Sequence, residues 1–99
     1  MIDFSKVIGF DWDVGNARKN AKHDVSQAEV EQLFSDPSLI VMRDEKHSET
    51  EIRYIAFGCT ADDRLLQTAF TLRSSSTLIR IISARDANRR ERKTYESQN

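Results

Sequence analysis

The chain is organised around residues 78–96, which read LIRIISARDANRRERKTYE. The segment begins with four apolar, β-favouring residues, Leu78, Ile79, Ile81 and Ile82, interrupted once. Such a run is typical of a strand that is apolar on both faces. It predicts a β-strand in the interior of a sheet, covered on both sides.

Arg80 is the residue that interrupts this run. A guanidinium is costly to bury unless it is paired. Arg80 therefore lies at a strand edge or in a structural ion pair, or a rigid strand holds it to meet a phosphate, which an arginine fork binds well. The sequence leaves both interpretations open.

A basic helix is predicted directly after this strand. Asn88, followed by Glu91 three positions later, matches a capping box, in which each side chain bonds the backbone N–H of the other residue. Four cations fall within five residues of its start: Arg89, Arg90, Arg92 and Lys93.

Length and composition predict one domain, residues 1–99. The hydrophobic content of 38% suffices for one core, and the charged content of 31% predicts a highly charged surface. Cys59 is the only cysteine, which rules out an intrachain disulfide and fits a reducing compartment. No apolar run approaches the ~18 residues that a membrane span needs. The composition thus favours a soluble, cytoplasmic protein.

The net charge of −1 conceals an asymmetry along the chain. Residues 24–63 carry ten acidic and three basic side chains, whereas residues 64–99 carry eight basic and three acidic ones. Such segregation suggests a polyanionic partner at one end of the molecule, unless the charges intermix in space.

Two helices are expected in the N-terminal third. A short strand over residues 7–12 precedes a polar, locally basic helix over residues 14–23. Ser26 and Glu29 form a second capping box, which starts a helix with one apolar stripe. That helix ends before Pro37, because the residue before a proline disfavours the helical conformation.

Three more strands are predicted over residues 39–42, 52–57 and 64–72, before the strand that begins at Leu78. Short connections between them favour consecutive antiparallel hairpins. The expected fold class is α+β: two N-terminal helices, an antiparallel meander of three or four strands, and a C-terminal basic helix.

The candidate chemistry rests on arginine, lysine and histidine. The two histidines and Cys59 are too far apart in sequence for a metal-site pattern, and no metal or cofactor is expected. RNA cleavage by attack of the 2′-OH needs a proton acceptor, a stabiliser of the charged phosphate and help for the departing 5′ oxygen. His23 beside Lys22 suits proton transfer, although it could simply cap a helix. His47 lies in an acidic segment and is interpreted as part of a plain surface loop.

Motifs spread over nearly the whole chain resemble the BrnT family of bacterial type II toxins. Each is short, but their order matches. They are Phe10-Asp11-Trp12-Asp13, Lys22-His23, Val25-Ser26, Phe34, Asp36-Pro37, His47-Ser48, Glu51, Arg53, Gly58, Arg80-Ile81-Ile82-Ser83-Ala84-Arg85, Arg89-Arg90-Glu91-Arg92 and Tyr95.

Two positions depart from the family pattern. Many members have a glycine where this chain has Asp24, and glycine accepts positive φ more easily. Many also carry a lysine where Gly15 and Asn16 stand here, so any role of that lysine has no counterpart.

The resemblance implies a RelE-like α+β fold and a ribonuclease that halts translation. It also implies a DNA-binding antitoxin partner of the BrnA type, with a dimer of heterodimers left open. Five residues at family positions become candidates for RNA contact and catalysis: Arg53, Arg80, Arg85, Lys22 and His23. Arg73 joins them because it ends a predicted strand, and the four helix cations are expected to track RNA or a partner. A non-catalytic nucleic-acid or protein-binding module is the alternative.

Overall fold

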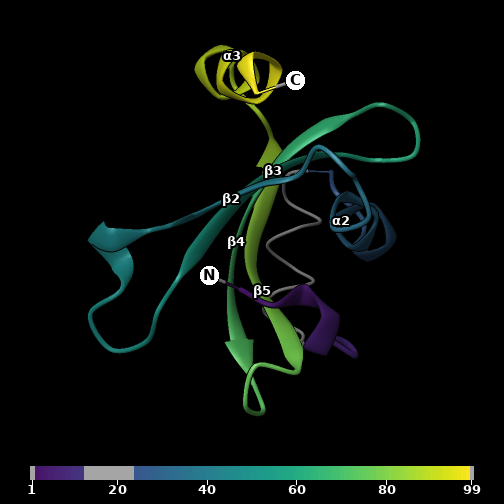
Figure 1. Cartoon of the computed structure of the whole chain (residues 1–99). Coiled ribbons are helices and arrows are strands. Elements are labelled where there is room, and N and C mark those ends of the chain that lie inside the picture. The colour runs from purple at the N-terminus through teal and green to yellow at the C-terminus, as the bar shows by residue number, and fades with distance from the viewer. Residues whose placement is uncertain (1, 13–23, 99) are drawn as a thin grey trace.

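The computed structural model describes residues 2–12 and 24–98. Within this part of the chain, the structure contains five strands, two α-helices and two short 3₁₀ helices (Figure 1). In chain order the elements are η1 (Phe4–Lys6), β1 (Gly9–Asp11), α2 (Gln27–Leu33), β2 (Ile40–Arg43), η2 (Glu45–His47), β3 (Tyr54–Cys59), β4 (Leu65–Arg73), β5 (Leu78–Asp86) and α3 (Arg89–Ser97).

The strands form one sheet in the order β1-β5-β4-β3-β2. Strands β2 to β5 pair antiparallel with their neighbours in sequence, while β1 pairs parallel with β5. β5 therefore lies in the interior, as predicted. The expectation of three or four antiparallel strands is wrong, because the short strand β1 adds itself to the far side of β5 in parallel. Parallel neighbours need a long crossover, which leaves no local turn signal in the sequence.

The expected layout, with two N-terminal helices first, does not match. β1 comes first, and the helix described before the meander, α2, begins only at Gln27. The helix predicted over residues 14–23 lies outside the described residues. Mixed α and β structure is nevertheless what the chain forms.

The two faces of β5 differ, contrary to the prediction that both are covered. Ile79, Ile81 and Ala84 are buried, whereas Ile82 is only partly buried. The position of Ile82 results from a β-bulge. Phe70 pairs with Ile81 and the preceding Ala69 pairs with Ser83, so Ile82 has no partner across the ladder. The alternation therefore shifts by one residue within the strand.

Helix α2 covers one face of the sheet. Its N-terminus carries the predicted capping box, with Ser26 Oγ accepting from the Glu29 N–H and Glu29 accepting from the Ser26 N–H. Leu33 is fully buried at its other end. A Cβ at Gly58 would stand 2.9 Å from the Leu33 carbonyl oxygen, so a glycine in β3 lets the helix approach the sheet closely.

Helix α3 lies at the end of the sheet rather than on its core face (Figure 1). It begins at Arg89, and Asn88 and Glu91 form the predicted capping box. None of its residues is buried. Polar contacts therefore contribute much of its attachment to the rest of the fold.

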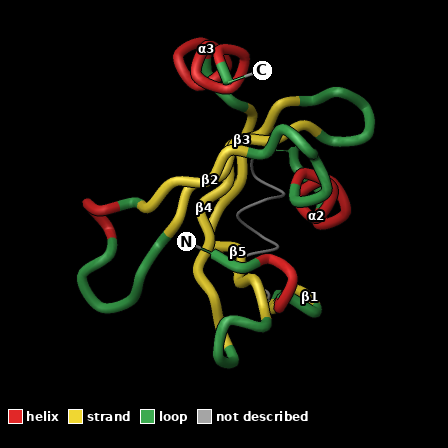
Figure 2. Tube along the Cα trace, viewed as in Figure 1, coloured by secondary structure: helices red, strands yellow, loops and turns green. Residues whose placement is uncertain are grey.

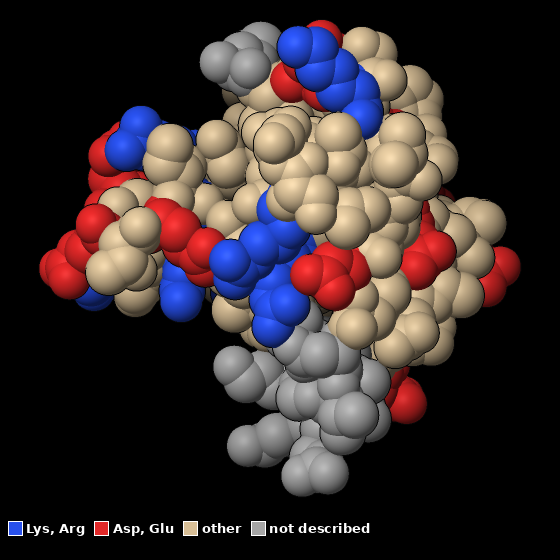
Figure 3. Space-filling view, turned by 90° about the horizontal axis from the view of Figure 1, so that it is seen from below, with Lys and Arg blue, Asp and Glu red and all other residues tan. Residues whose placement is uncertain are grey.

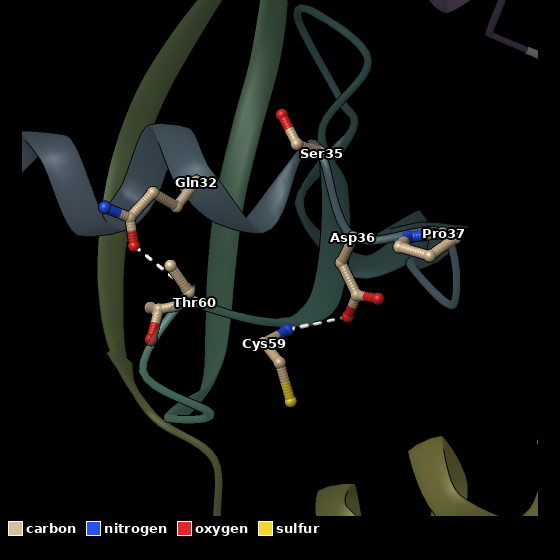
Figure 4. A pocket seen from close by; sticks show the side chains of 7 residues that line it. Gln32, Ser35, Asp36, Pro37, Cys59 and Thr60 are labelled. Atoms are coloured by element: carbon tan, nitrogen blue, oxygen red, sulfur yellow. Dashed lines mark hydrogen bonds between the residues drawn. The ribbon is translucent and has the colours of Figure 1, made fainter.

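The principal contact of this kind is made by Tyr95, whose hydroxyl donates to Asp36 Oδ2 at 2.6 Å. The Cys59 N–H donates to the same oxygen at 2.8 Å, beside a hollow of about 320 Å³ that Gln32 and Pro37 also line (Figure 4). Burial alone would raise the pKa of Asp36, but these hydrogen bonds outweigh burial and lower it. Burial and the bond to Asp36 both raise the pKa of Tyr95. This network ties α3 to the turn after α2 and to β3.

Candidate functional site

Strand register places three of the predicted site residues, Arg73, Arg80 and Arg85, on one face of the sheet, and Arg53, directly before β3, continues the alternation of that strand. Arg80 lies opposite Thr71, and Arg85 lies opposite Gln67, which shares its side of β4 with Thr71. Arg73 and Arg53 follow the same alternation, Arg73 two residues after Thr71 and Arg53 two residues before Ile55. We call the set Arg53, Arg73, Arg80 and Arg85 the arginine face; it lies opposite the face that α2 covers.

Arg80 is held at the junction of β5 and β1. The parallel register sets Asp11 beside it, and Arg80 Nη1 lies 3.2 Å from Asp11 Oδ2. The side chains of Arg80 and Asp11 are 30% and 36% exposed. The interpretation of Arg80 as a residue of an ion pair is therefore confirmed. The pair is partly exposed, so solvent or an anion can reach it.

Two further arginines of the face are paired with carboxylates. Arg73 Nη1 lies 3.1 Å from Glu51 Oε2, which links the end of β4 to the β2–β3 connection. Arg85 makes a two-pronged contact with Glu91, at 2.7 and 2.8 Å. Hydrogen bonding is the main reason that the pKa of Arg85 is raised and that of Glu91 lowered. Glu91 also caps α3, so Arg85 is fixed to the start of that helix.

Arg53 differs from the other three. Within residues 2–12 and 24–98, no carboxylate is paired with its guanidinium. Its backbone, however, is fixed on both sides: its N–H donates to Ser48 Oγ at 3.0 Å, and its carbonyl accepts from the Asp44 N–H at 2.8 Å. The backbone of Arg53 is therefore fixed, while its guanidinium has no carboxylate partner among the described residues.

Charge on the surface that Figure 3 shows from below is mixed rather than uniformly basic. Figure 3 shows a central group of basic side chains with acidic side chains bordering it on both sides. The charges that are segregated along the sequence thus mix in part in the fold. Glu51 of the acidic segment pairs with Arg73 of β4, and Asp11 of the N-terminal segment pairs with Arg80 of β5.

The cations of α3 form a separate set. Arg89, Arg90, Arg92 and Lys93 are all exposed. They follow β5, whereas Arg73 and Arg80 lie toward its beginning, at the β4–β5 turn. The structure therefore brings Arg53, Arg73 and Arg80 to one region, places Arg85 beside α3, and does not bring the helix cations to the other arginines. Lys22 and His23 lie outside the described residues.

Sequence reasoning missed the acidic partners Asp11 and Glu51, together with a contact between Asp44 and His47. Each depends on a pairing or a loop shape that no local motif encodes. Among the described residues, no group of three or more His, Cys, Asp or Glu side chains is placed to hold a metal ion. In the same part of the chain, no helix has the length and apolar character needed to cross a membrane.

A small α+β domain that presents several arginines on the sheet face opposite its helix α2 has the features of a class of protein that contacts a polyanion. The family can be stated directly. Residues 12–91 match the model described as "Ribonuclease toxin, BrnT, of type II toxin-antitoxin system", so the chain belongs to the BrnT family. No curated protein matches the chain. Membership makes it a ribonuclease toxin and implies an antitoxin partner, as the resemblance predicted.

Proposed function

We propose that this chain is an endoribonuclease that cleaves RNA without a metal ion and inhibits translation in the cytoplasm. The observation that carries the proposal is the arginine face, on which Arg80 is held within β5 and Arg53 is held by backbone hydrogen bonds directly before β3, both partly exposed. Guanidinium groups on rigid elements can stabilise the charge that develops on a phosphate in the transition state. A RelE-like relationship of the fold is part of the same proposal.

The proposed roles differ along the face. Arg53 and Arg80 contact the reacting phosphate, and Arg73 contacts an adjacent one. Arg85 orients the α3 end of the site through Glu91, and the α3 cations track the RNA backbone or a partner. Lys22 and His23 remain proposed for proton transfer toward the departing 5′ oxygen, directly or through water.

The proposed partner is a DNA-binding antitoxin of the BrnA type, in a dimer of heterodimers. Large apolar side chains that stay exposed within the described ranges include Ile8, Met42 and Ile52. Exposed apolar groups of this kind are suited to a protein contact. Trp12 and Tyr95 are less suited to such a contact, because both are half-buried and hydrogen-bonded.

A non-catalytic binding module is the second candidate. What favours it is that Arg73, Arg80 and Arg85 already have carboxylate partners, as arginines of a purely structural network do. The test is to free the purified protein from its antitoxin and incubate it with RNA, with and without ribosomes. The proposal predicts cleavage at ribonucleotides and none where the scissile nucleotide is 2′-deoxy. RNA binding without cleavage under all these conditions would establish the binding module instead.

A further inference from the structure

A carboxylate and an imidazole are paired in the connection between β2 and β3. Asp44 Oδ2 lies 2.8 Å from His47 Nδ1. The Asp44 side chain is 15% exposed and that of His47 is 56% exposed. The carboxylate therefore lies inside the loop while the ring faces solvent. In catalytic sites, a carboxylate placed in this way orients a histidine that accepts or donates a proton.

The contact displaces the ordinary role of an aspartate at this position. Asp44 is the N-cap of η2, where aspartate side chains usually accept from backbone N–H groups of the first turn. Its side chain makes no such bond, and its carboxylate faces the imidazole. An ionised carboxylate only accepts hydrogen bonds, so in the neutral ring it fixes the proton on Nδ1. Nε2 then carries the lone pair and can accept a proton.

The same loop is locked to Arg53. Besides the Asp44 N–H to Arg53 carbonyl bond, Ser48 Oγ accepts from the Arg53 N–H at 3.0 Å and donates to the Asp44 carbonyl at 2.6 Å. Histidine and arginine thus stand on the two sides of one hydrogen-bonded loop. Figure 2 shows this loop, with η2 in red, on the side of the sheet away from α2.

We infer that His47 is the general base of the proposed RNA cleavage and that Asp44 is its positioning residue. The inference rests on the proposed function. Nε2 takes the proton of the 2′-OH as the 2′ oxygen bonds to phosphorus and the bond from phosphorus to the 5′ oxygen breaks. The electron pair of that bond stays on the 5′ oxygen, which takes a proton from water. The products are a 2′,3′-cyclic phosphate and a free 5′-OH, and the proton on His47 returns to solvent.

Several charges surround the imidazole. On its own turn are Asp44, Lys46 and Glu45, and Glu45 pairs with Arg43 of β2 at 3.2 Å. Arg53 lies across the loop, directly before β3, where its carbonyl accepts from the Asp44 N–H, and Glu51 of the same connection pairs with Arg73 of β4. Acidic and basic groups are thus both present, and Asp44 is the one in contact with the ring.

The experiment measures single-turnover cleavage of one RNA oligonucleotide from pH 5 to 8 by the wild-type protein, His47→Asn, His47→Gln, Asp44→Asn and Glu45→Gln. General-base catalysis typically contributes ~10²- to 10⁴-fold, so both His47 variants should lose about 10²-fold or more at neutral pH. Their remaining rate should no longer rise through the range in which histidines titrate. Asp44→Asn should lose less. Glu45→Gln, which breaks only the pair with Arg43, should match the wild type.

Melting curves and RNA affinities of the same proteins separate chemistry from folding and binding. Unchanged affinity with a lost rate supports the inference. Cleavage by folded His47 variants at the wild-type rate and with the wild-type pH profile would overturn it and leave the pair as a fastening of the loop. Failure of the wild-type protein itself to cut RNA would overturn the proposed function, and the inference with it.

Discussion

Arginine is used in two different ways in this molecule, at the Arg64 junction and on the arginine face. Arg64 donates to Asp86 through Nε and Nη2 at 2.6 and 2.9 Å, and through Nη1 to Glu29 and to the Asp24 carbonyl. On the arginine face, Arg73 pairs with Glu51 and Arg80 pairs with Asp11, whereas Arg53 has no carboxylate partner among the described residues.

The difference teaches which arginines can meet a ligand. At the Arg64 junction the acceptors come from the N-terminus of α2 and from β5, so one guanidinium joins three parts of the fold. Hydrogen bonding to Asp86, in spite of burial, raises the pKa of Arg64. Four of the five N–H groups of this guanidinium already donate to acceptors within the fold, so little is left for a phosphate to bind there. On the face, Arg73 can exchange the partly exposed carboxylate of Glu51 for a phosphate at little cost, because pairs near the surface contribute only ~0.2–1 kcal/mol.

The largest effect is expected from Arg53→Ala. Loss of a preorganised donor to a transition-state charge costs ~10²-fold or more in rate. Cleavage should fall by about that factor while the melting temperature changes little, since the fixed groups at Arg53 are backbone atoms. Single-turnover kinetics with a melting curve check both parts, and a large loss of stability would contradict the assignment.

Arg64→Ala should instead destabilise the fold. Charge-assisted hydrogen bonds are worth ~1.5–3 kcal/mol, so we expect a loss of about 2 kcal/mol in the free energy of unfolding. Denaturant titration measures it. The cleavage rate per folded molecule should stay near wild type, which makes Arg64→Ala the matched control for Arg53→Ala. A fully stable variant that has lost cleavage would remove the distinction between the two regions.

The Arg64 junction should also make stability fall in acid. Hydrogen bonds to the Ser26 backbone and to Arg64 lower the pKa of Glu29, and the bond with Arg64 lowers the pKa of Asp86. For a lowered pKa, the stabilisation is present above the unfolded value and is lost as pH falls through the folded value. Unfolding free energies measured below pH 4.5 should decline less steeply in Arg64→Ala than in the wild type.

Glu51→Gln should tighten RNA binding modestly. The substitution frees Arg73 and removes a negative charge from the path of the phosphates, for which we expect a gain of ~2- to 5-fold in affinity. Fluorescence anisotropy at low salt measures it. Glu45→Gln, which removes an equal charge from the same connection, gives the control, and an equal gain there would mean that net charge alone is responsible.

The smallest effect is expected on α3. Arg92 is exposed and lies beyond the far end of β5 from Arg73. Arg92→Ala should weaken RNA binding slightly and reduce the log–log salt slope by roughly one unit or less, without changing the rate at saturating protein. Binding titrations at several salt concentrations check this, and a rate loss comparable to that of Arg53→Ala would join α3 to the catalytic region.

Local motifs predicted the local structure. Both capping boxes, the start of α3 and the interior place of β5 follow from residues close together in sequence, such as Ser26 with Glu29. The bulge at Ile82 does not, because it depends on how β4 and β5 match across the ladder. The parallel pairing of β1, which sets Asp11 beside Arg80, does not follow from them either.

The candidate site shows the same division. Family positions selected Arg53 and Arg80, and the end of a predicted strand selected Arg73, but neither showed that the three share one face, which depends on how the strands pair. His47 was assigned to a plain loop because its contact with Asp44 arises from the shape of a 3₁₀ turn.

The most direct test is the cleavage rate of Arg80→Ala, measured beside its RNA affinity and its melting curve. If the arginine face is the catalytic surface, the folded variant should lose about 10²-fold or more in single-turnover rate, with a much smaller change in the dissociation constant. If Arg80→Ala and Arg53→Ala both remain folded and cut RNA at near wild-type rates, the arginine face is not where catalysis takes place.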